Sequence, residues 1–247
     1  SLFMEQTTKR RIAKTTPSEI VRRTKRETTY KGAAKKETVV LVGKTPKQDE
    51  YIKALDTANQ IIVLGPAGTG KTYIAATAAC NLYITKQIDK IIITRPNVAA
   101  GKSIGYFPGT LEEKMMPWVM PVLEILHKHL GRGAVDTGIK SGNIEIAPFE
   151  TMRGRSFEDA FVILDEAQNV TTHEMKMFLT RVGQNVTVIL NGDIQQSDLG
   201  ETSGLSKAIH LAKKHMIPVP VIEFGVEDIV RSQLCKQWIV AFMKEGL

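Results

Sequence analysis

Short apolar runs recur along this 247-residue chain and alternate with segments of helical periodicity. Each run is rich in β-branched side chains and is bounded by turn or polar residues, as buried strands are. The runs occupy residues 61–64, 91–94, 144–147, 161–164, 186–190 and 219–224. Helical patterns lie between several of them, at 48–58, 71–84, 111–130 and 172–182. Strands that alternate with helices predict an α/β domain, in which a mostly parallel sheet is flanked by helices.

The first 44 residues lack this alternation, apart from one candidate strand at 38–42. We therefore expect a basic, partly flexible arm at residues 1–44 and a compact domain at residues 45–247. Two prolines, Pro117 and Pro121, fall inside the predicted helix at 111–130. Because proline has no backbone N–H, we expect them to kink or interrupt that helix.

Charge separates the arm from the domain. The chain carries a formal charge of +7, but residues 1–47 hold 13 Lys and Arg against 4 Asp and Glu, which is +9. The remaining 200 residues hold 20 against 22, which is −2. An arm of this kind can track a phosphate backbone, so RNA or single-stranded DNA is a candidate partner. A solvated tail that only aids solubility would show the same pattern.

Nothing in the sequence indicates a membrane protein or a disulfide-rich one. No stretch approaches the roughly 18 apolar residues that are needed to cross a bilayer, and the N-terminus shows no apolar secretory segment. The two cysteines, Cys80 and Cys235, fall in helical segments and are expected to be buried free thiols. We therefore expect a cytoplasmic protein that makes no membrane contact.

Residues 61–72 read IIVLGPAGTGKT, in which an apolar strand runs into G-x-x-x-x-G-K-T and then into a helix. The free N–H groups and the dipole at a helix N-terminus attract phosphate, and glycines let the backbone wrap the anion closely. Lys71 is expected to reach the β- and γ-phosphates, and the Thr72 hydroxyl to bind Mg²⁺. The alternative is a tight strand–helix turn without a ligand. The predicted nucleotide-binding residues are Gly65, Pro66, Ala67, Gly68, Thr69, Gly70, Lys71 and Thr72.

A second strand, in FVILDEAQNV at 161–170, ends in the adjacent carboxylates Asp165 and Glu166. Groups at the carboxyl end of a parallel strand face the crevice in which ligands bind. We expect Asp165 to hold Mg²⁺, directly or through water, and Glu166 to act as general base on the attacking water. Gln168, two residues further on, adds a polar group that is able to sense the γ-phosphate.

A third strand, in VTVILNGDIQQSDL at 186–199, ends in Asn191-Gly192-Asp193. A polar residue at the end of such a strand can contact the γ-phosphate or its water, whereas the same letters in isolation are a common turn. Upstream, Gln48 lies 17 residues before Gly65, where its amide is suited to recognise adenine. A glutamine that faces solvent on a first helical turn is the alternative.

Basic side chains supply two further candidates. The glycine-rich segment 93–109 contains Arg95 and Lys102, which are candidates for nucleic-acid contact, although a purely structural loop fits equally well. The charge on a transferred γ-phosphate is often stabilised by an arginine from a neighbouring subunit. Among Arg153, Arg155, Arg181 and Arg231 we favour Arg231, because it follows the last predicted strand.

Together these motifs resemble those of the PhoH family of P-loop ATPases, which is similar to the first motor domain of superfamily-1 helicases. The resemblance is carried by GPAGTGKT, TRPNVAAGKSIGYFPGTLEEKMMPW, ETMRGRSF, FVILDEAQNVTTHEMKMFLTRVG, NGDIQQSDL and EDIVRSQL. It implies a single RecA-like P-loop domain. By the resemblance, Gln48 is the adenine-reading glutamine, residues 65–72 form helicase motif I, and Arg95 belongs to motif Ia. Asp165, Glu166 and Gln168 match motif II. Gly192, Asp193 and Gln196 match motif III, and the resemblance implies that Gln196 is catalytic. The family's VRH reads VRS here, with Ser232, and no PIN nuclease domain is present, so RNA cleavage is not implied.

The resemblance implies ATP hydrolysis that requires Mg²⁺ and is coupled to RNA or single-stranded DNA. A nucleotide-dependent switch for an RNA or protein partner, with little motor activity, is the alternative. ATP is favoured over GTP because no N-K-x-D pattern is seen. Only 48 residues follow position 199, far fewer than the roughly 100–150 of a second motor domain. We therefore expect a homo-oligomeric ring, a hexamer by the resemblance, in which a neighbour completes the site.

Overall fold

The computed structural model describes residues 36–96, 117–194 and 203–247. Within them, six strands form one sheet in the order β3-β2-β4-β5-β1-β6, and all neighbouring strands pair in parallel. The strands are β1 (Gln60–Leu64), β2 (Lys90–Arg95), β3 (Ile144–Pro148), β4 (Ala160–Leu164), β5 (Val186–Gly192) and β6 (Val221–Glu223). The predicted fold class is confirmed. Because the strands are parallel, all their carboxyl ends meet at one edge of the sheet.

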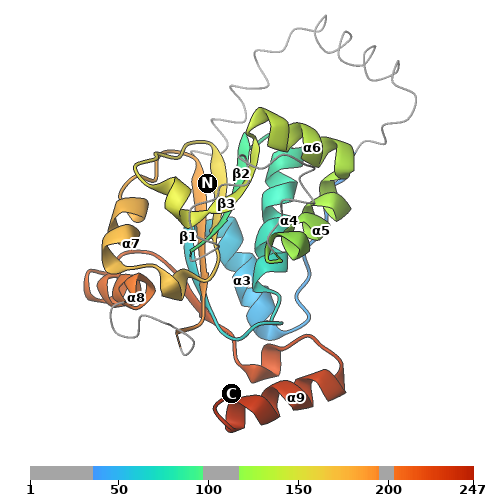
Figure 1. The fold of residues 1–247 in the computed structure, drawn as a ribbon, viewed down its shortest axis with the longest axis vertical. Helices are drawn as coiled ribbons and strands as arrows, with labels where there is room; N and C mark the ends of the chain where they lie inside the picture. The colour runs from blue at the N-terminus through green and yellow to red at the C-terminus, as the bar shows by residue number, and fades with distance from the viewer. Residues whose placement is uncertain (1–35, 97–116, 195–202) are drawn as a thin grey trace, which may run out of the picture. The chain divides into compact units, whose positions relative to one another are not determined.

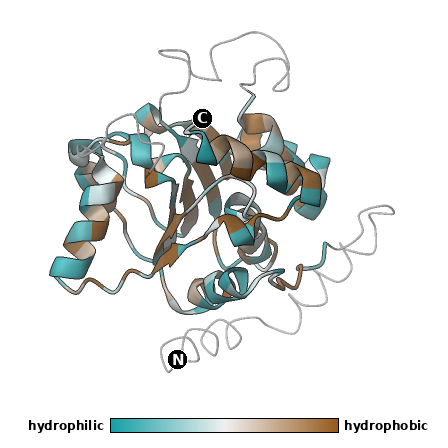
Figure 2. Cartoon of the chain, turned by 90° about the horizontal axis from the view of Figure 1, so that it is seen from below, coloured by the Kyte–Doolittle hydropathy of each residue, from teal (hydrophilic) through white to brown (hydrophobic). Residues whose placement is uncertain are grey.

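Helices cover both faces of the sheet (Figure 1). One face packs against α3 (Pro46–Thr57), α4 (Lys71–Ile84), α5 (Val119–Leu130) and α6 (Arg132–Ser141). The other packs against α7 (Thr172–Leu179) and α8 (Gly204–Lys214). Side chains alternate between the two faces, so that Ile163 and Ile189 lie on the α4 side while Leu164 and Leu190 lie on the α7 side. Figure 2 shows the strands between the helices as an apolar layer.

The predicted helices differ from the observed ones mainly at their ends. The segment 71–84 coincides with α4, whereas the helix predicted at 172–182 ends at Leu179. The predicted segment 111–130 begins in residues that lie outside the described part of the chain, and α5 starts at Val119. Pro117 precedes α5, and Pro121 lies in its first turn, where a missing N–H costs no hydrogen bond. The pattern gave no bounds for three helices, namely α6, α8 and α9 (Gln233–Lys244), although it placed Cys235 of α9 in a helical segment.

The segment before α3 does not form the predicted strand. Residues 38–42 are extended but pair with no strand among the described residues. Instead, the Asn81 side chain of α4 accepts a hydrogen bond from Val39 N (2.8 Å) and donates one to Val39 O (2.8 Å). The compact unit therefore spans Glu37–Leu247 and begins before Thr45. Residues 1–35 of the predicted arm lie outside the described part of the chain.

The two cysteines differ in environment. Cys80 is buried in α4, and its burial raises the pKa of the thiol to about 12. Cys235 is exposed, which corrects the expectation of two buried thiols. The reason is that α9 buries none of its residues, and the large side chains of Leu234, Trp238 and Phe242 stay exposed along it. No helix in the described ranges combines the length and apolarity that a bilayer span requires.

Candidate functional site

Four loops meet at the carboxyl edge of the sheet. The P-loop, residues 65–72, follows β1, and the acidic pair follows β4. Strand β5 lies between these two strands and ends at Gly192. Gly65 N donates a hydrogen bond to Gly192 O (3.0 Å), and Asp165 N donates one to Thr94 O at the end of β2 (2.8 Å). The sheet order therefore brings together segments that are far apart in the sequence.

The P-loop has the backbone shape that its glycines require. Gly65, Gly68 and Gly70 have φ angles of 137°, 84° and 87°, in the left-handed region that other residues rarely adopt. A Cβ atom at Gly65 would also lie 2.6 Å from Phe224 O. Gly70 is the N-cap of α4 and has no side chain to satisfy the N–H groups of the first turn. The loop therefore presents free N–H groups at a helix N-terminus, which is an anion-binding arrangement.

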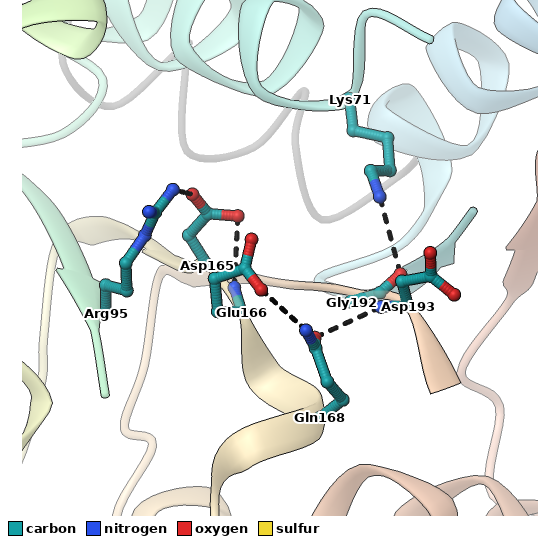
Figure 3. Close-up of polar contacts among 7 residues, drawn as sticks. All are labelled: Lys71, Arg95, Asp165, Glu166, Gln168, Gly192 and Asp193. Atoms are coloured by element: carbon teal, nitrogen blue, oxygen red, sulfur yellow. Dashed lines mark hydrogen bonds and ion pairs between the residues drawn. The ribbon is translucent and has the colours of Figure 1, made fainter. Parts of the chain in front are cut away.

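Lys71 folds over this loop. Its Nζ donates a hydrogen bond to Gly65 O. It also lies 3.4 Å from Gly192 O (Figure 3). Burial lowers the pKa of Lys71, and the nearby carboxylates of Asp165, Asp193 and Glu166 oppose that shift. The ammonium group therefore bridges the P-loop and the end of β5. Thr72 follows in the first turn of α4 and is half-buried.

Asp165 forms an ion pair that the sequence did not predict. Its Oδ2 lies 2.5 Å from the Arg95 guanidinium, and its Oδ1 accepts a hydrogen bond from Glu166 N (3.0 Å). The Arg95 guanidinium also lies over the Trp118 ring, 5.4 Å from its centroid. The residue expected to hold Mg²⁺ and the residue expected to contact nucleic acid therefore bind each other (Figure 3).

Glu166 is connected to the end of β5 through Gln168. The amide nitrogen of Gln168 donates to Glu166 Oε2 (2.5 Å), and its amide oxygen accepts from Asp193 N (3.1 Å). Glu166 itself has a φ angle of 51°. A non-glycine residue in this region costs about 1–3 kcal/mol, and such residues cluster at functional sites. Gln168 therefore orients the predicted general base, a role that the sequence did not assign to it.

Gln48 is buried against the P-loop and does not face solvent. Its amide nitrogen donates to Thr69 O (2.8 Å), and its amide oxygen accepts from Lys44 N (2.7 Å). Both ends of the amide are therefore used within the chain, and adenine recognition by Gln48 stays a prediction. A cavity of about 510 Å³ adjoins this side of the P-loop and is lined by Gln48, Gly68 and Tyr73 among others.

Arg231 lies beside the P-loop of its own chain. Its Nε would lie 3.1 Å from a Cβ atom on Gly68, and Val230 N donates to Gly68 O (2.9 Å). Arg231 therefore lies near the P-loop of its own chain, and its contribution in trans stays a prediction. Arg155, another arginine candidate, forms a forked ion pair with Glu145 (2.6 and 2.9 Å). The predicted residues Gln196 and Lys102 lie outside the described residues.

A second cavity, of about 410 Å³, lies on the other face of the sheet. It is lined mainly by apolar side chains of α7, α8 and the strands beneath them, such as Met175 and Leu211. It contains no residue of the P-loop and neither carboxylate of the acidic pair. This cavity is therefore separate from the residues predicted to bind the nucleotide.

Comparison with known proteins identifies relatives over most of the chain. The PhoH-like protein family matches residues 40–243. Protein PhoH of Escherichia coli (strain K12) is 45% identical over 211 residues, which cover 84% of this chain and 59% of that protein. The PhoH-like protein of Bacillus subtilis (strain 168) is 44% identical over 205 residues, covering 82% and 64%. The chain therefore spans about three fifths of the length of these relatives.

Two solved structures are similar at low sequence identity. The Sulfolobus solfataricus SWI2/SNF2 ATPase core in complex with dsDNA has a TM-score of 0.47 and 11% identity, covering 81% of this chain and 49% of that one. The Pif1 helicase from Candida albicans has a TM-score of 0.41 and 15% identity, covering 83% and 44%.

Proposed function

This chain belongs to the PhoH family, and from that premise we propose that it hydrolyses ATP in a Mg²⁺-dependent reaction coupled to RNA or single-stranded DNA. The observation that carries the proposal is the convergence of Lys71, Asp165 and Glu166 at one edge of the sheet (Figure 3). A phosphate cradle and two carboxylates are the groups that nucleotide hydrolysis needs. The homo-oligomeric ring expected from the sequence is part of the same proposal.

Each side chain has one task in this proposal. The free N–H groups of the P-loop and the Lys71 ammonium bind the phosphates, and the adjoining 510 Å³ cavity accepts the nucleoside. Glu166, held by Gln168, takes a proton from the attacking water. Gln168 also accepts a hydrogen bond from Asp193 N, so a shift at the end of β5 would change the position of the Glu166 carboxylate.

The residues present suit a magnesium ion that arrives with the nucleotide. Mg²⁺ is usually held by one or two carboxylates, several waters and the phosphates themselves. Asp165 and Thr72 are the side chains that would hold it, and the ion would neutralise charge on the transferred phosphoryl group. Within the described ranges, no group of three or more His, Cys, Asp or Glu side chains could bind a metal.

Phosphate release from ATP tests the proposal. We expect hydrolysis with Mg²⁺ and none with EDTA, and we expect RNA or single-stranded DNA to raise the rate in a salt-sensitive way. Equal rates with and without nucleic acid would contradict the coupling and favour the nucleotide-dependent switch. If the unchanged chain released no phosphate under any of these conditions, the ATPase assignment would be wrong.

The ion pair between Arg95 and Asp165 makes a separate prediction. Because the guanidinium occupies the carboxylate that is expected to hold the metal, Arg95→Gln should lower the Mg²⁺ concentration for half-maximal nucleotide binding. A partly exposed ion pair worth about 1 kcal/mol corresponds to about a fivefold change. Titration of Mg²⁺ at constant fluorescent ADP measures this concentration. Arg155→Gln removes a comparable ion pair away from the site and should change nothing. An unchanged or higher Mg²⁺ requirement in Arg95→Gln would show that Arg95 does not compete with the metal.

A further inference from the structure

Asn191 is a polar residue in a position that the core otherwise fills with apolar side chains. It lies near the end of β5, and 1% of its surface is exposed. The two residues before it, Ile189 and Leu190, belong to the hydrophobic core on opposite faces of the sheet. Because side chains alternate along a strand, Asn191 lies on the same face as Ile189, which is the face covered by α4.

The Asn191 side chain has no hydrogen-bond partner among the residues that the structure describes. This holds for both its amide nitrogen and its amide oxygen. Burying an amide without partners costs free energy, and an apolar side chain at this position would avoid that cost. Buried groups of this kind call for an explanation, and a bound water or ion is one of the usual ones. The amide therefore points to a ligand and not to a role in packing.

Strand register identifies what the amide faces. Leu164, the last residue of β4, is paired with Leu190 of β5, and Asp165 and Asn191 are the residues that directly follow this pair. On its other side Asn191 is paired with Val63, two residues before the P-loop. Ile163 of β4 and Ile189 of β5 both face α4, and Asp165 and Asn191 follow them by two residues. Asn191 therefore lies on the α4 face of the sheet, between the metal-binding candidate Asp165 and the strand that leads into the P-loop.

We propose that Asn191 binds the hydration shell of the metal ion held by Asp165. This proposal rests on the nucleotide-binding function proposed above. Mg²⁺ in phosphate sites keeps several of its waters, and these waters donate hydrogen bonds to acceptors around them. The asparagine amide oxygen is such an acceptor, and it does not add a second charge beside Asp165. The residue is a positioning residue, because it acts on the metal through water.

Substitution of Asn191 by valine separates this role from a structural one. Asn191→Val should raise the melting temperature of the nucleotide-free protein, because it removes two unpartnered polar groups from the interior. The same change should weaken the stabilisation that Mg²⁺ adds in the presence of ADP. Loss of an outer-shell partner typically costs 10–100-fold in metal affinity, so we expect the Mg²⁺ midpoint to rise about tenfold. Melting curves at constant ADP and increasing Mg²⁺ measure both effects without relying on turnover.

Thr94→Val is the matched control. The Thr94 hydroxyl is also buried without a partner among the described residues, but its neighbour in register, Leu164, faces α7. Thr94→Val should therefore raise the melting temperature and leave the Mg²⁺ midpoint unchanged. Asn191→Thr, which places a hydroxyl that can accept a hydrogen bond at the same position, should restore part of the Mg²⁺ response. If Asn191→Val does not fold, Asn191→Ala serves in the same titration with the same expected shift.

Three outcomes separate this inference from the function on which it rests. If Mg²⁺ adds no stability to the unchanged protein with ADP, the proposed nucleotide function itself fails. If the unchanged protein responds and Asn191→Val responds equally, only the role of Asn191 is overturned. A defect seen with ATPγS but not with ADP would also overturn it, because it would assign the amide to the γ-phosphate and not to water on the metal.

Discussion

Glu166→Gln is expected to bind ATP as tightly as the unchanged protein while its hydrolysis rate falls by about 10²–10⁴-fold, the usual contribution of a general base. The amide has the size of the carboxylate but cannot take a proton from the attacking water. The substitution should preserve local structure, because the oxygen of the new amide can still accept the hydrogen bond from Gln168. Nucleotide titration and phosphate release, measured on the same preparation, separate binding from turnover.

Glu174→Gln is the matched control for this change. Glu174 belongs to the capping box of α7, in which glutamine is also accepted, so the variant should fold and hydrolyse ATP normally. A Glu166→Gln protein that kept more than a tenth of the hydrolysis rate would remove Glu166 from the role of general base. The proton acceptor would then have to be sought elsewhere at the carboxyl edge of the sheet.

Lys71→Ala is expected to act at the earlier step, nucleotide binding. The Lys71 ammonium lies across the P-loop, close to Gly65 O. It also lies close to Gly192 O at the end of β5 (Figure 3). A hydrogen bond to a charged group contributes about 1.5–3 kcal/mol, so its loss should weaken ATP binding by about 10–100-fold. Fluorescent nucleotide titration measures the change directly. Hydrolysis should fall as well, because the same ammonium stabilises the transferred phosphoryl group.

Lys47→Ala provides the comparison for Lys71→Ala. Lys47 is an exposed lysine of α3 that pairs with Glu50, and its removal should leave ATP affinity unchanged. Should Lys71→Ala bind ATP with unchanged affinity, the lysine would not be a phosphate ligand in this chain. The ion pairs and hydrogen bonds that now surround it would then need a purely structural explanation.

Much of the fold was predictable from local pattern, because strands and helices of this kind have regular periodicities. The helix predicted at 71–84 coincides with α4, and all six strands of the predicted sheet agree with observed strands to within two residues at each end. The pattern failed for α6, α8 and α9. α6 contains two glycines, which lower helix propensity, and α9 buries none of its residues.

The order of strand, glycine loop and helix was sufficient by itself to locate the P-loop, because the groups that bind phosphate there are contiguous in the chain. Pattern also located the acidic pair at the end of a strand. Only the tertiary structure joined Arg95 to Asp165, 70 residues apart, and paired Leu164 with Leu190, the residues that directly precede Asp165 and Asn191. These neighbours depend on strand order and on the register of hydrogen bonds between parallel strands. Register is decided by packing of the whole sheet against its helices, and no short stretch of sequence specifies it.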